Sequence, residues 1–351
     1  MAEKMRALQY TTVGKAPEIV ELDRPTPGPG QVLLKITAAG VCHSDEFVMS
    51  LPEDVFTTMG WRTPMTLGHE GAGTVAELGQ GVTEFSVGDS VAVYGPWGCG
   101  VCDYCVVGKE MLCPHAAALG IQAPGLGAPG AMADYMIVDT ARHLVPLGDL
   151  DPVASVSLTD AGLTPYHAIK RSLHKLTPGK VAVCIGAGGL GHMAIQILRA
   201  ISPVTVVALD VSEQKLELAR EVGAHHTFMS DATAVEKVRA LTNGVGVAAV
   251  FDFVGNDVTA GMAGQMVAPE AEISIVGVGG GSLPVGFGIG PWDVAVRSPY
   301  WGSRPELIEV FELARAGKIS VEHEVFALID GPRAYERLHE GTLRGRAVLV
   351  P

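Results

Sequence analysis

Apolar positions in the first part of the chain follow the period of β-strands. Residues 6–11 and 31–38 alternate or run apolar, and a stretch rich in Pro and Gly at 25–30 separates them, which predicts a strand, a turn and a strand. Residues 72–76 and 87–94 predict further short strands. Because helical periodicity is rare in this part, a mostly β domain is expected here.

The pattern changes near residues 155–165 to strands that alternate with helices. The apolar run Val181–Ile185 predicts a buried strand, a Gly-rich turn follows it, and a helix is predicted over 192–200. Further strands are predicted over 204–209, 225–229, 247–252 and 272–277, and helices over 212–222, 231–241 and 257–267, with Ser212 as an N-cap. This alternation is typical of a doubly wound parallel sheet, so the predicted fold class is α/β.

The last part of the chain contains both predicted helices and predicted strands. Beyond Gly277 the sequence is Gly-rich, and apolar spacing at Leu307, Val310 and Phe311 then predicts a helix over 304–315. A strand over 319–327, a helix over 332–339 and a strand over 346–350 are predicted to follow. The second domain is therefore expected to be inserted in the first.

Composition and charge argue against several classes of function. The 351 residues suggest about two domains, and 48% hydrophobic against 18% charged residues allow large cores. A net charge of -13 argues against nucleic acid or an anionic membrane as a partner. No apolar run approaches the ~20 residues of a membrane span, and the start lacks the apolar core of a signal peptide. A cytoplasmic location is expected.

Three glycines between a predicted strand and a predicted helix indicate a dinucleotide site. Gly186, Gly188 and Gly191 form G-x-G-x-x-G, which allows a tight turn, approach of the backbone to a pyrophosphate, and close packing of helix on strand. Asp210 ends the next strand, where a carboxylate binds ribose hydroxyls and repels a 2′-phosphate, and Val211 offers no positive charge. NAD is therefore favoured over NADP. The alternative is a Gly-rich turn with a surface Asp.

Four of the six cysteines are closely spaced. Cys99, Cys102, Cys105 and Cys113 follow C-x2-C-x2-C-x7-C, with glycines between them. Four thiolates close a tetrahedron without an open position, which predicts a structural zinc site. An iron–sulfur cluster also uses four thiolates, but nothing else in the chain indicates electron transfer. A nucleic-acid-binding zinc ribbon is a further alternative, against which the acidic charge speaks.

Cys42, His69 and Asp160 offer a thiolate, an imidazole and a carboxylate. Three protein ligands with an open fourth position are typical of a catalytic zinc site. Each residue also has a plainer explanation, because a buried cysteine packs in a core, a histidine hydrogen-bonds there, and Glu70 or Asp160 forms a salt bridge. Convergence of the three is not visible from their positions in the sequence.

Together these motifs resemble those of the zinc-dependent medium-chain alcohol dehydrogenases over essentially the whole chain. The likeness includes Cys42-His43-Ser44-Asp45, Gly68-His69-Glu70, the four-cysteine segment and the ending at 345–350. Segments 93–99, 159–167 and 299–302 more closely resemble actinobacterial secondary alcohol dehydrogenases and phenylacetaldehyde reductases. The resemblance implies a GroES-like catalytic domain over 1–157 and 295–351, with a structural zinc lobe at 95–115, and an NAD-binding Rossmann domain over 158–294.

The resemblance also implies roles for individual residues. Cys42, His69 and Asp160 would bind the catalytic zinc, Glu70 would lie behind it as an exchangeable ligand, and Asp45 would accept a hydrogen bond from His69. Ser44 would pass a proton from the substrate to the cofactor ribose. Residues expected at the cofactor are Thr164 at the nicotinamide, His43 and Arg346 at the phosphates, and Gly186, Gly188, Gly189, Leu190, Gly191, Asp210 and Lys215.

By the same resemblance, Phe47, Leu119, Tyr300 and Trp301 would line the substrate pocket, and their bulk favours aryl or long alkyl groups. Tyr300 and Trp301 could also lie at a subunit interface, and a homotetramer is expected. There are two departures from the family pattern. Phe47 stands where the liver-type proton relay ends in histidine, and the segment around 51–62 is longer than in the bacterial branch.

The expected function is reversible oxidation of secondary or primary alcohols to ketones or aldehydes. The expected cofactors are NAD and two zinc ions per chain, one catalytic and one structural. Three alternatives remain: a polyol dehydrogenase of the same family, a zinc-free quinone reductase, and a catalytically silent NAD-binding protein. The complete set of ligand residues and Ser44 speak against the last two.

Overall fold

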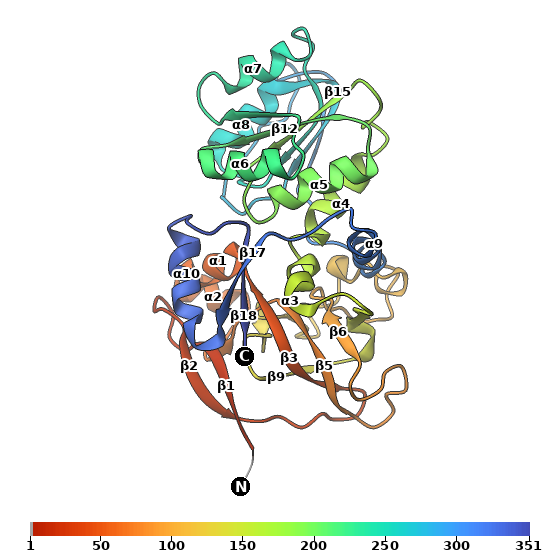
Figure 1. Ribbon diagram of the computed structural model, residues 1–351, viewed down its shortest axis with the longest axis vertical. Coiled ribbons are helices and arrows are strands. Elements are labelled where there is room, and N and C mark those ends of the chain that lie inside the picture. Colours follow the sequence, from red (N-terminus) through yellow and green to blue (C-terminus); the bar gives the residue numbers. More distant parts are fainter. Residues whose placement is uncertain (1–2) are drawn as a thin grey trace. The chain divides into compact units, whose positions relative to one another are not determined.

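The computed structural model describes residues 3–351 and, among them, two compact units. The first unit ends at Asp160 and takes up the chain again over Ser303–Arg315 and Ser320–Pro351. The second consists of Ala161–Gly302 with the short segment Ala316–Ile319. In Figure 1 the ribbon of the first unit is red to yellow and dark blue, and that of the second is mainly green to light blue.

The first unit is built around a mainly antiparallel sheet with the strand order β10-β6-β5-β3-β18-β17, in which β9 also pairs with β3. Its strands are β3 (Val32–Val41), β5 (Glu70–Leu78), β6 (Ser90–Val93), β9 (Tyr135–Val138), β10 (Leu144–Pro146), β17 (His323–Ala327) and β18 (Arg346–Val350). Because β18 pairs with β3, with Val348 opposite Gly40, the C-terminal segment completes a sheet that the N-terminal part begins. A smaller sheet, β2-β1-β4, contains β1 (Lys4–Tyr10), β2 (Glu18–Asp23) and β4 (Met65–Thr66), and β7 (Ala123–Pro124) pairs with β8 (Gly127–Ala128).

Short helices surround the sheets of the first unit. They are α1 (His43–Ser50), α2 (Glu53–Thr58), α3 (Pro152–Ser155), α9 (Arg304–Arg315) and α10 (Gly331–His339), with the 3-10 turns η1 (Cys105–Val107), η2 (Glu110–Leu112), η3 (Ala141–His143), η4 (Val156–Thr159) and η5 (Leu328–Asp330). Leu34, Val75 and Leu349 of the large sheet belong to one buried cluster with Leu338 of α10. Each such side chain contributes about 1.5–3 kcal/mol by leaving water, which fixes the strand ends that carry the site described below.

The second unit contains a parallel sheet with the order β13-β12-β11-β14-β15-β16. Its strands are β11 (Val181–Ile185), β12 (Thr205–Asp210), β13 (His226–Met229), β14 (Val247–Asp252), β15 (Val267–Ile275) and β16 (Ala295–Arg297), and its helices are α4 (Leu163–Ser172), α5 (Gly191–Ile201), α6 (Glu213–Glu221), α7 (Ala234–Ala240) and α8 (Asp257–Met266). The strand order reverses between β11 and β14. Doubly wound sheets bind ligands beyond the carboxyl ends of the strands at such a point.

The predicted fold class is confirmed, and the predicted bounds of β11, β14, α9 and β18 agree with the structure. The helices α1 and α4 were not predicted. Leu163–Ile169 of α4 is buried on all sides, so the segment has no polar face to produce a helical period. Ser212 lies at the N-cap of α6, but its side chain makes no capping hydrogen bond. Within residues 3–351, no helix is both long and apolar enough to cross a bilayer.

Candidate active site and structural metal centre

Cys42, His69, Glu70 and Asp160 come together in the first unit, and their ligand atoms all lie within 4.8 Å of one another. We call these four residues the Cys–His–Asp cluster. Cys42 follows β3, and His69 precedes β5. Because these strands are antiparallel neighbours, with Gly40 opposite Glu70, the two ligand residues emerge at the same end of the sheet. Asp160 follows the η4 turn.

The spacing of the cluster fits a zinc ion. The Sγ atom of Cys42 lies 3.5 Å from Oδ2 of Asp160, and Nε2 of His69 lies 3.6 Å from the same oxygen. Ligand bonds of about 2.0–2.3 Å in a tetrahedral site place the ligand atoms about 3.5 Å apart. All four residues of the cluster are buried, Asp160 being the most exposed at 8%. A thiol, an imidazole and carboxylates are therefore gathered at the separation that zinc requires.

Asp45 holds His69 from behind. It is fully buried on α1, where Oδ1 lies 3.0 Å from Nδ1 of His69 and Oδ2 accepts the backbone N–H of Cys42 at 3.0 Å. This contact leaves Nε2 of His69 to face Cys42 and Asp160. Burial alone would lower the pKa of His69, but the carboxylates of Asp45 and Asp160 outweigh it and raise the pKa well above the usual 6.5. The two carboxylates therefore favour positive charge on the ring of His69.

Glu70 forms a buried ion pair with Arg346 of β18. Burial raises the pKa of Glu70 to about 7, although the charge of Arg346 lowers it in part. Gly40 makes room for this carboxylate, since a Cβ atom there would lie 1.7 Å from Oε2 of Glu70. In this structure the guanidinium of Arg346 faces Glu70, and its predicted contact with cofactor phosphates stays a prediction.

The other residues predicted on α1 have different surroundings. Ser44 is partly buried, and its Oγ lies 3.7 Å from Sγ of Cys42. His43 is exposed, and its Nδ1 lies 2.6 Å from Oε2 of Glu46. Phe47 is 39% exposed and offers no proton acceptor one helical turn after Ser44.

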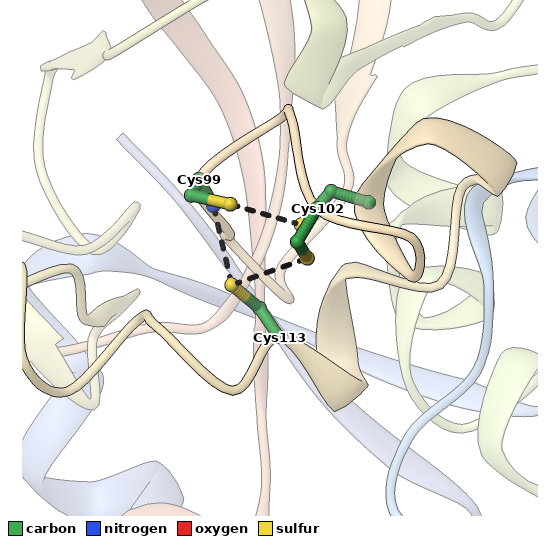
Figure 2. Close-up of side chains that lie close together, drawn as sticks. Cys99, Cys102 and Cys113 are labelled. Atoms are coloured by element: carbon green, nitrogen blue, oxygen red, sulfur yellow. Dashed lines mark hydrogen bonds between the residues drawn. The ribbon is translucent and has the colours of Figure 1, made fainter.

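The four cysteines of the second motif also come together. Figure 2 shows Cys99, Cys102 and Cys113 pointing toward one another, and all four sulfur atoms lie within 4.8 Å of one another. The Sγ–Sγ distances are 3.9 Å from Cys99 to Cys105 and 3.9 Å from Cys102 to Cys113. Zn–S bonds of about 2.3 Å in a tetrahedron give about 3.8 Å between sulfur atoms. The four-cysteine cluster therefore fits a structural zinc ion.

A network of charged side chains packs beside the four-cysteine cluster. It was not predicted from the sequence. Oε1 of Glu110, which is 2% exposed, lies 2.5 Å from Nε of Arg142 and 3.4 Å from Nε2 of His143. The guanidinium of Arg142 also donates to the carbonyl of Gly98 at 2.9 Å. A Cβ atom at Gly100 would lie 1.8 Å from Nη1 of Arg142. The glycines between the cysteines permit this close approach of Arg142, and they are the feature of the sequence that could have indicated the network.

The Gly-rich turn of the second unit has the shape of a phosphate cradle. Gly186 has a φ of +86°, and a Cβ atom at Gly191 would lie 1.8 Å from the carbonyl oxygen of Gly186, so the turn is tight. A Cβ atom at Gly188 would meet only Nζ of Lys215, at 4.0 Å. The backbone there is open, a lysine is near it, and the helix that follows directs its first N–H groups toward the opening. Gly189 and Leu190 complete the turn.

Asp210 is held at the edge of this turn. Its Oδ2 accepts the backbone N–H of Ala187 at 2.8 Å, and its Oδ1 accepts that of Ser212 at 2.9 Å. The side chain is 6% exposed, and the neighbouring Val211 is 76% exposed. A carboxylate therefore lies next to the cradle, with no positively charged side chain at the position that follows.

The remaining predicted residues differ in exposure. Thr164 is buried in the first turn of α4. Of the predicted pocket residues, Leu119 and Tyr300 are 62% and 55% exposed, whereas Trp301 is 4% exposed. Leu119 belongs to the first unit, and Thr164, Tyr300 and Trp301 belong to the second.

Two family models match the chain. "Alcohol dehydrogenase GroES-like domain" matches residues 28–149, and "Zinc-binding dehydrogenase" matches residues 189–316. Among curated relatives, the NAD-dependent alcohol dehydrogenase of Sulfurisphaera tokodaii is 35% identical over 99% of this chain and 100% of its own. D-arabinose 1-dehydrogenase (NADP(+)) of Saccharolobus solfataricus is 34% identical over 95% of this chain and 94% of its own.

Solved structures agree with these relatives. The alcohol dehydrogenase of Aeropyrum pernix has a TM-score of 0.90 at 33% identity and covers 99% of this chain and 100% of its own. Acetophenone reductase of Geotrichum candidum, solved in complex with NAD, has a TM-score of 0.85 at 29% identity. The match covers 100% of this chain and 98% of the reductase. The narrower likeness to actinobacterial enzymes stays a prediction. The matches over both halves and the two donor clusters place this chain in the zinc-dependent medium-chain alcohol dehydrogenase family.

Proposed function

We propose that this protein oxidises secondary or primary alcohols reversibly to ketones or aldehydes with NAD. The observation that supports this proposal most is the gathering of Cys42, His69 and Asp160 at zinc-binding distances, with the hydroxyl of Ser44 beside the thiol. A silent NAD-binding protein would have no need to bury a thiol, an imidazole and two carboxylates together, because burying such groups costs free energy.

Each residue has a stated task in this proposal. When bound, zinc would act as a Lewis acid at the substrate oxygen and NAD would accept the hydride. Cys42, His69 and Asp160 would hold the ion, and Glu70 would be available as a further ligand. Ser44 would take up the hydroxyl proton of the alcohol and pass it to the cofactor ribose. Because Phe47 has no proton acceptor, α1 offers no second relay residue one helical turn after Ser44.

NAD is proposed rather than NADP because of Asp210. Its buried carboxylate lies beside the phosphate cradle, where it suits two ribose hydroxyls and repels a 2′-phosphate. Lys215 and the open backbone at Gly188 would receive the pyrophosphate. The NADP-dependent relative shows that the fold accepts either cofactor, so this choice is open to a direct test.

Bulky apolar substrates are proposed from the family resemblance, which assigns the large apolar side chains of Phe47, Leu119, Tyr300 and Trp301 to the substrate. The similarity to an acetophenone reductase supports this class. A sugar or other polyol is the second candidate, and the 34% identity to a D-arabinose dehydrogenase favours it. A homotetramer is proposed from the family resemblance alone, and analytical ultracentrifugation would test it.

The first test compares initial rates of the zinc-loaded protein at neutral pH. NADH consumption would be measured with acetophenone, NADPH would be run in parallel, and D-arabinose oxidation would be followed with NAD and NADP. Clear reduction of acetophenone with NADH and little with NADPH is the expected result. Activity only with D-arabinose would favour the second candidate. No rate with any pair, in protein shown to hold two zinc ions, would contradict the proposed function.

A further inference from the structure

His192 lies directly after the G-x-G-x-x-G turn of the second unit. It is the second residue of α5, and its side chain is fully buried. Its Nδ1 atom lies 3.0 Å from the carbonyl oxygen of Gly188, the second glycine of the motif. The same oxygen accepts the backbone N–H of His192 at 3.0 Å. The carbonyl of Gly188 therefore receives two hydrogen bonds from one residue.

The contact with Gly188 determines which ring nitrogen of His192 carries a proton. A carbonyl oxygen can only accept a hydrogen bond, so Nδ1 of His192 is the donor and is protonated. Burying an imidazole costs free energy unless it is hydrogen-bonded, and this bond offsets part of that cost. The buried ring therefore donates to the turn and not to solvent.

The start of the turn is held from its other side by β12. The N–H of Gly186 donates to the carbonyl of Leu209 at 2.7 Å. The N–H of Ala187 donates to Oδ2 of Asp210 at 2.8 Å. Both acceptors are residues at the carboxyl end of β12. His192 holds the next residue of the turn from α5, so the backbone of the turn is supported by a strand and by a helix.

The support from α5 orients the peptide group that joins Gly188 to Gly189. A trans peptide group is planar, and its C=O and N–H bonds point in opposite directions. Because the C=O bond points into α5, the N–H bond of Gly189 points out of the helix, to the side on which anions bind at a helix N-terminus. A Cβ atom at Gly188 would meet only Nζ of Lys215, at 4.0 Å, so the backbone is open there.

We propose that His192 is a positioning residue for the cofactor pyrophosphate: its Nδ1–H holds the carbonyl of Gly188 and thereby aims the N–H of Gly189 at the phosphate. The inference rests on the proposed binding of NAD to this turn. Without the ring donor, the carbonyl keeps only its backbone hydrogen bond, and the peptide group can tilt. A hydrogen bond of this kind contributes up to about a factor of 10 to an equilibrium, so we expect about 10-fold weaker binding of NADH.

Two substitutions of His192 separate the hydrogen bond from packing. His192→Leu removes the donor and keeps an apolar side chain that favours a helix. His192→Asn is smaller, but its amide nitrogen takes the place of Nδ1 and can donate to the same carbonyl. Glutamine would be ambiguous, because Gln196 reaches the carbonyl four residues back in α5, at 3.3 Å. A packing role predicts higher NADH affinity for His192→Leu, and the proposed role predicts higher affinity for His192→Asn.

Ser202 provides a matched control at the other end of α5. It follows the last residue of the helix, and its Oγ donates to the carbonyl of Leu198, four residues back, at 2.7 Å. His192 and Gly188 have the same spacing. Ser202→Ala therefore removes the same kind of side-chain hydrogen bond from the same helix, about 15 Å from the Gly-rich turn.

The experiment measures equilibrium binding to the zinc-loaded protein. NADH binding is followed by fluorescence, and ADP-ribose and adenosine are measured as competitors. ADP-ribose contains the pyrophosphate, whereas adenosine lacks it and keeps the ribose hydroxyls that Asp210 is proposed to bind. Melting temperatures show that each variant is folded. If His192→Leu does not fold, His192→Met takes its place, since it also lacks the donor.

The proposal predicts that His192→Leu binds NADH and ADP-ribose about 10-fold more weakly and binds adenosine as the wild type does. His192→Asn should bind all three ligands nearly as tightly as the wild type, even if its melting temperature is lower, and Ser202→Ala should not differ from the wild type. Wild-type NADH affinity in His192→Leu, an equal loss in His192→Asn, or an equal loss for adenosine would overturn the proposal and leave His192 with a packing role. If the wild-type protein binds no NADH, the proposed function fails, and not only this inference.

Discussion

Arg346 and Glu70 form an ion pair, 276 positions apart in the chain, at the edge of the Cys–His–Asp cluster. The two side chains are 3% and 0% exposed. Glu70 is the first residue of β5 and Arg346 the first of β18, and both strands pair with β3. The ion pair therefore joins the C-terminal segment to the strands that carry the proposed zinc ligands.

Replacing Arg346 with Met should destabilise the first unit strongly. Removing one partner of a buried pair leaves an uncompensated charge and costs about 3–5 kcal/mol. The double variant Glu70→Gln with Arg346→Met should lose less, since neither charge then remains. Denaturant unfolding of the three proteins measures this. If the free energy of unfolding of Arg346→Met lies within about 0.5 kcal/mol of the wild-type value, the ion pair does not stabilise the C-terminal segment.

His143 should make stability depend on pH. Burial opposes its charge, but the hydrogen bond with Asp139 and the charge of Glu110 outweigh burial and raise the pKa of His143 above 6.5. A group whose pKa is raised by folding stabilises fully below its unfolded pKa, and this stabilisation is lost as the pH rises through the folded pKa. The melting temperature of wild type should therefore exceed that of His143→Gln most at about pH 6, and the difference should shrink by about pH 9. A difference that grows with pH would contradict this sign.

Asp210 should decide the choice of cofactor. Asp210→Ser removes the charge that would repel a 2′-phosphate while leaving a hydroxyl for the neighbouring N–H groups of Ala187 and Ser212. The ratio of kcat/KM for NADPH to that for NADH should rise by at least about 10-fold, or 1.4 kcal/mol. Asp231→Ser, at an exposed aspartate beyond the end of β13, serves as the control. If the ratio is the same in wild type and Asp210→Ser, Asp210 does not select NAD.

Much of the fold was predictable from sequence because its signals are local. The run Val181–Ile185 and the glycines that follow it specify a buried strand and a tight turn without help from the rest of the chain. The helix α4 gave no such signal, since burial on all sides removes the polar face on which helical periodicity depends. Tertiary packing, and not the local sequence pattern, determines that this segment is helical.

The site was predictable only in part, because several of its contacts join segments that lie far apart in the sequence. The ligand residues stand in recognisable motifs, and family resemblance suggested their convergence. The contacts of Arg346 with Glu70 and of Arg142 with Glu110 join distant segments, and no local pattern marks either contact. Such partners become visible only when segments far apart in the chain, such as the strands β5 and β18, are placed together.

The most direct test of the account is the turnover of Asp160→Ala together with its zinc content and NADH binding. Asp149→Ala is the matched control, because the side chain of Asp149 is 88% exposed. We expect Asp160→Ala to lose one of two zinc ions and to slow NADH-dependent reduction by at least about 100-fold, or 2.7 kcal/mol. NADH affinity should stay at the value of Asp149→Ala. Near wild-type turnover with both zinc ions retained would contradict the assignment of Asp160 as a ligand and, with it, the proposed mechanism.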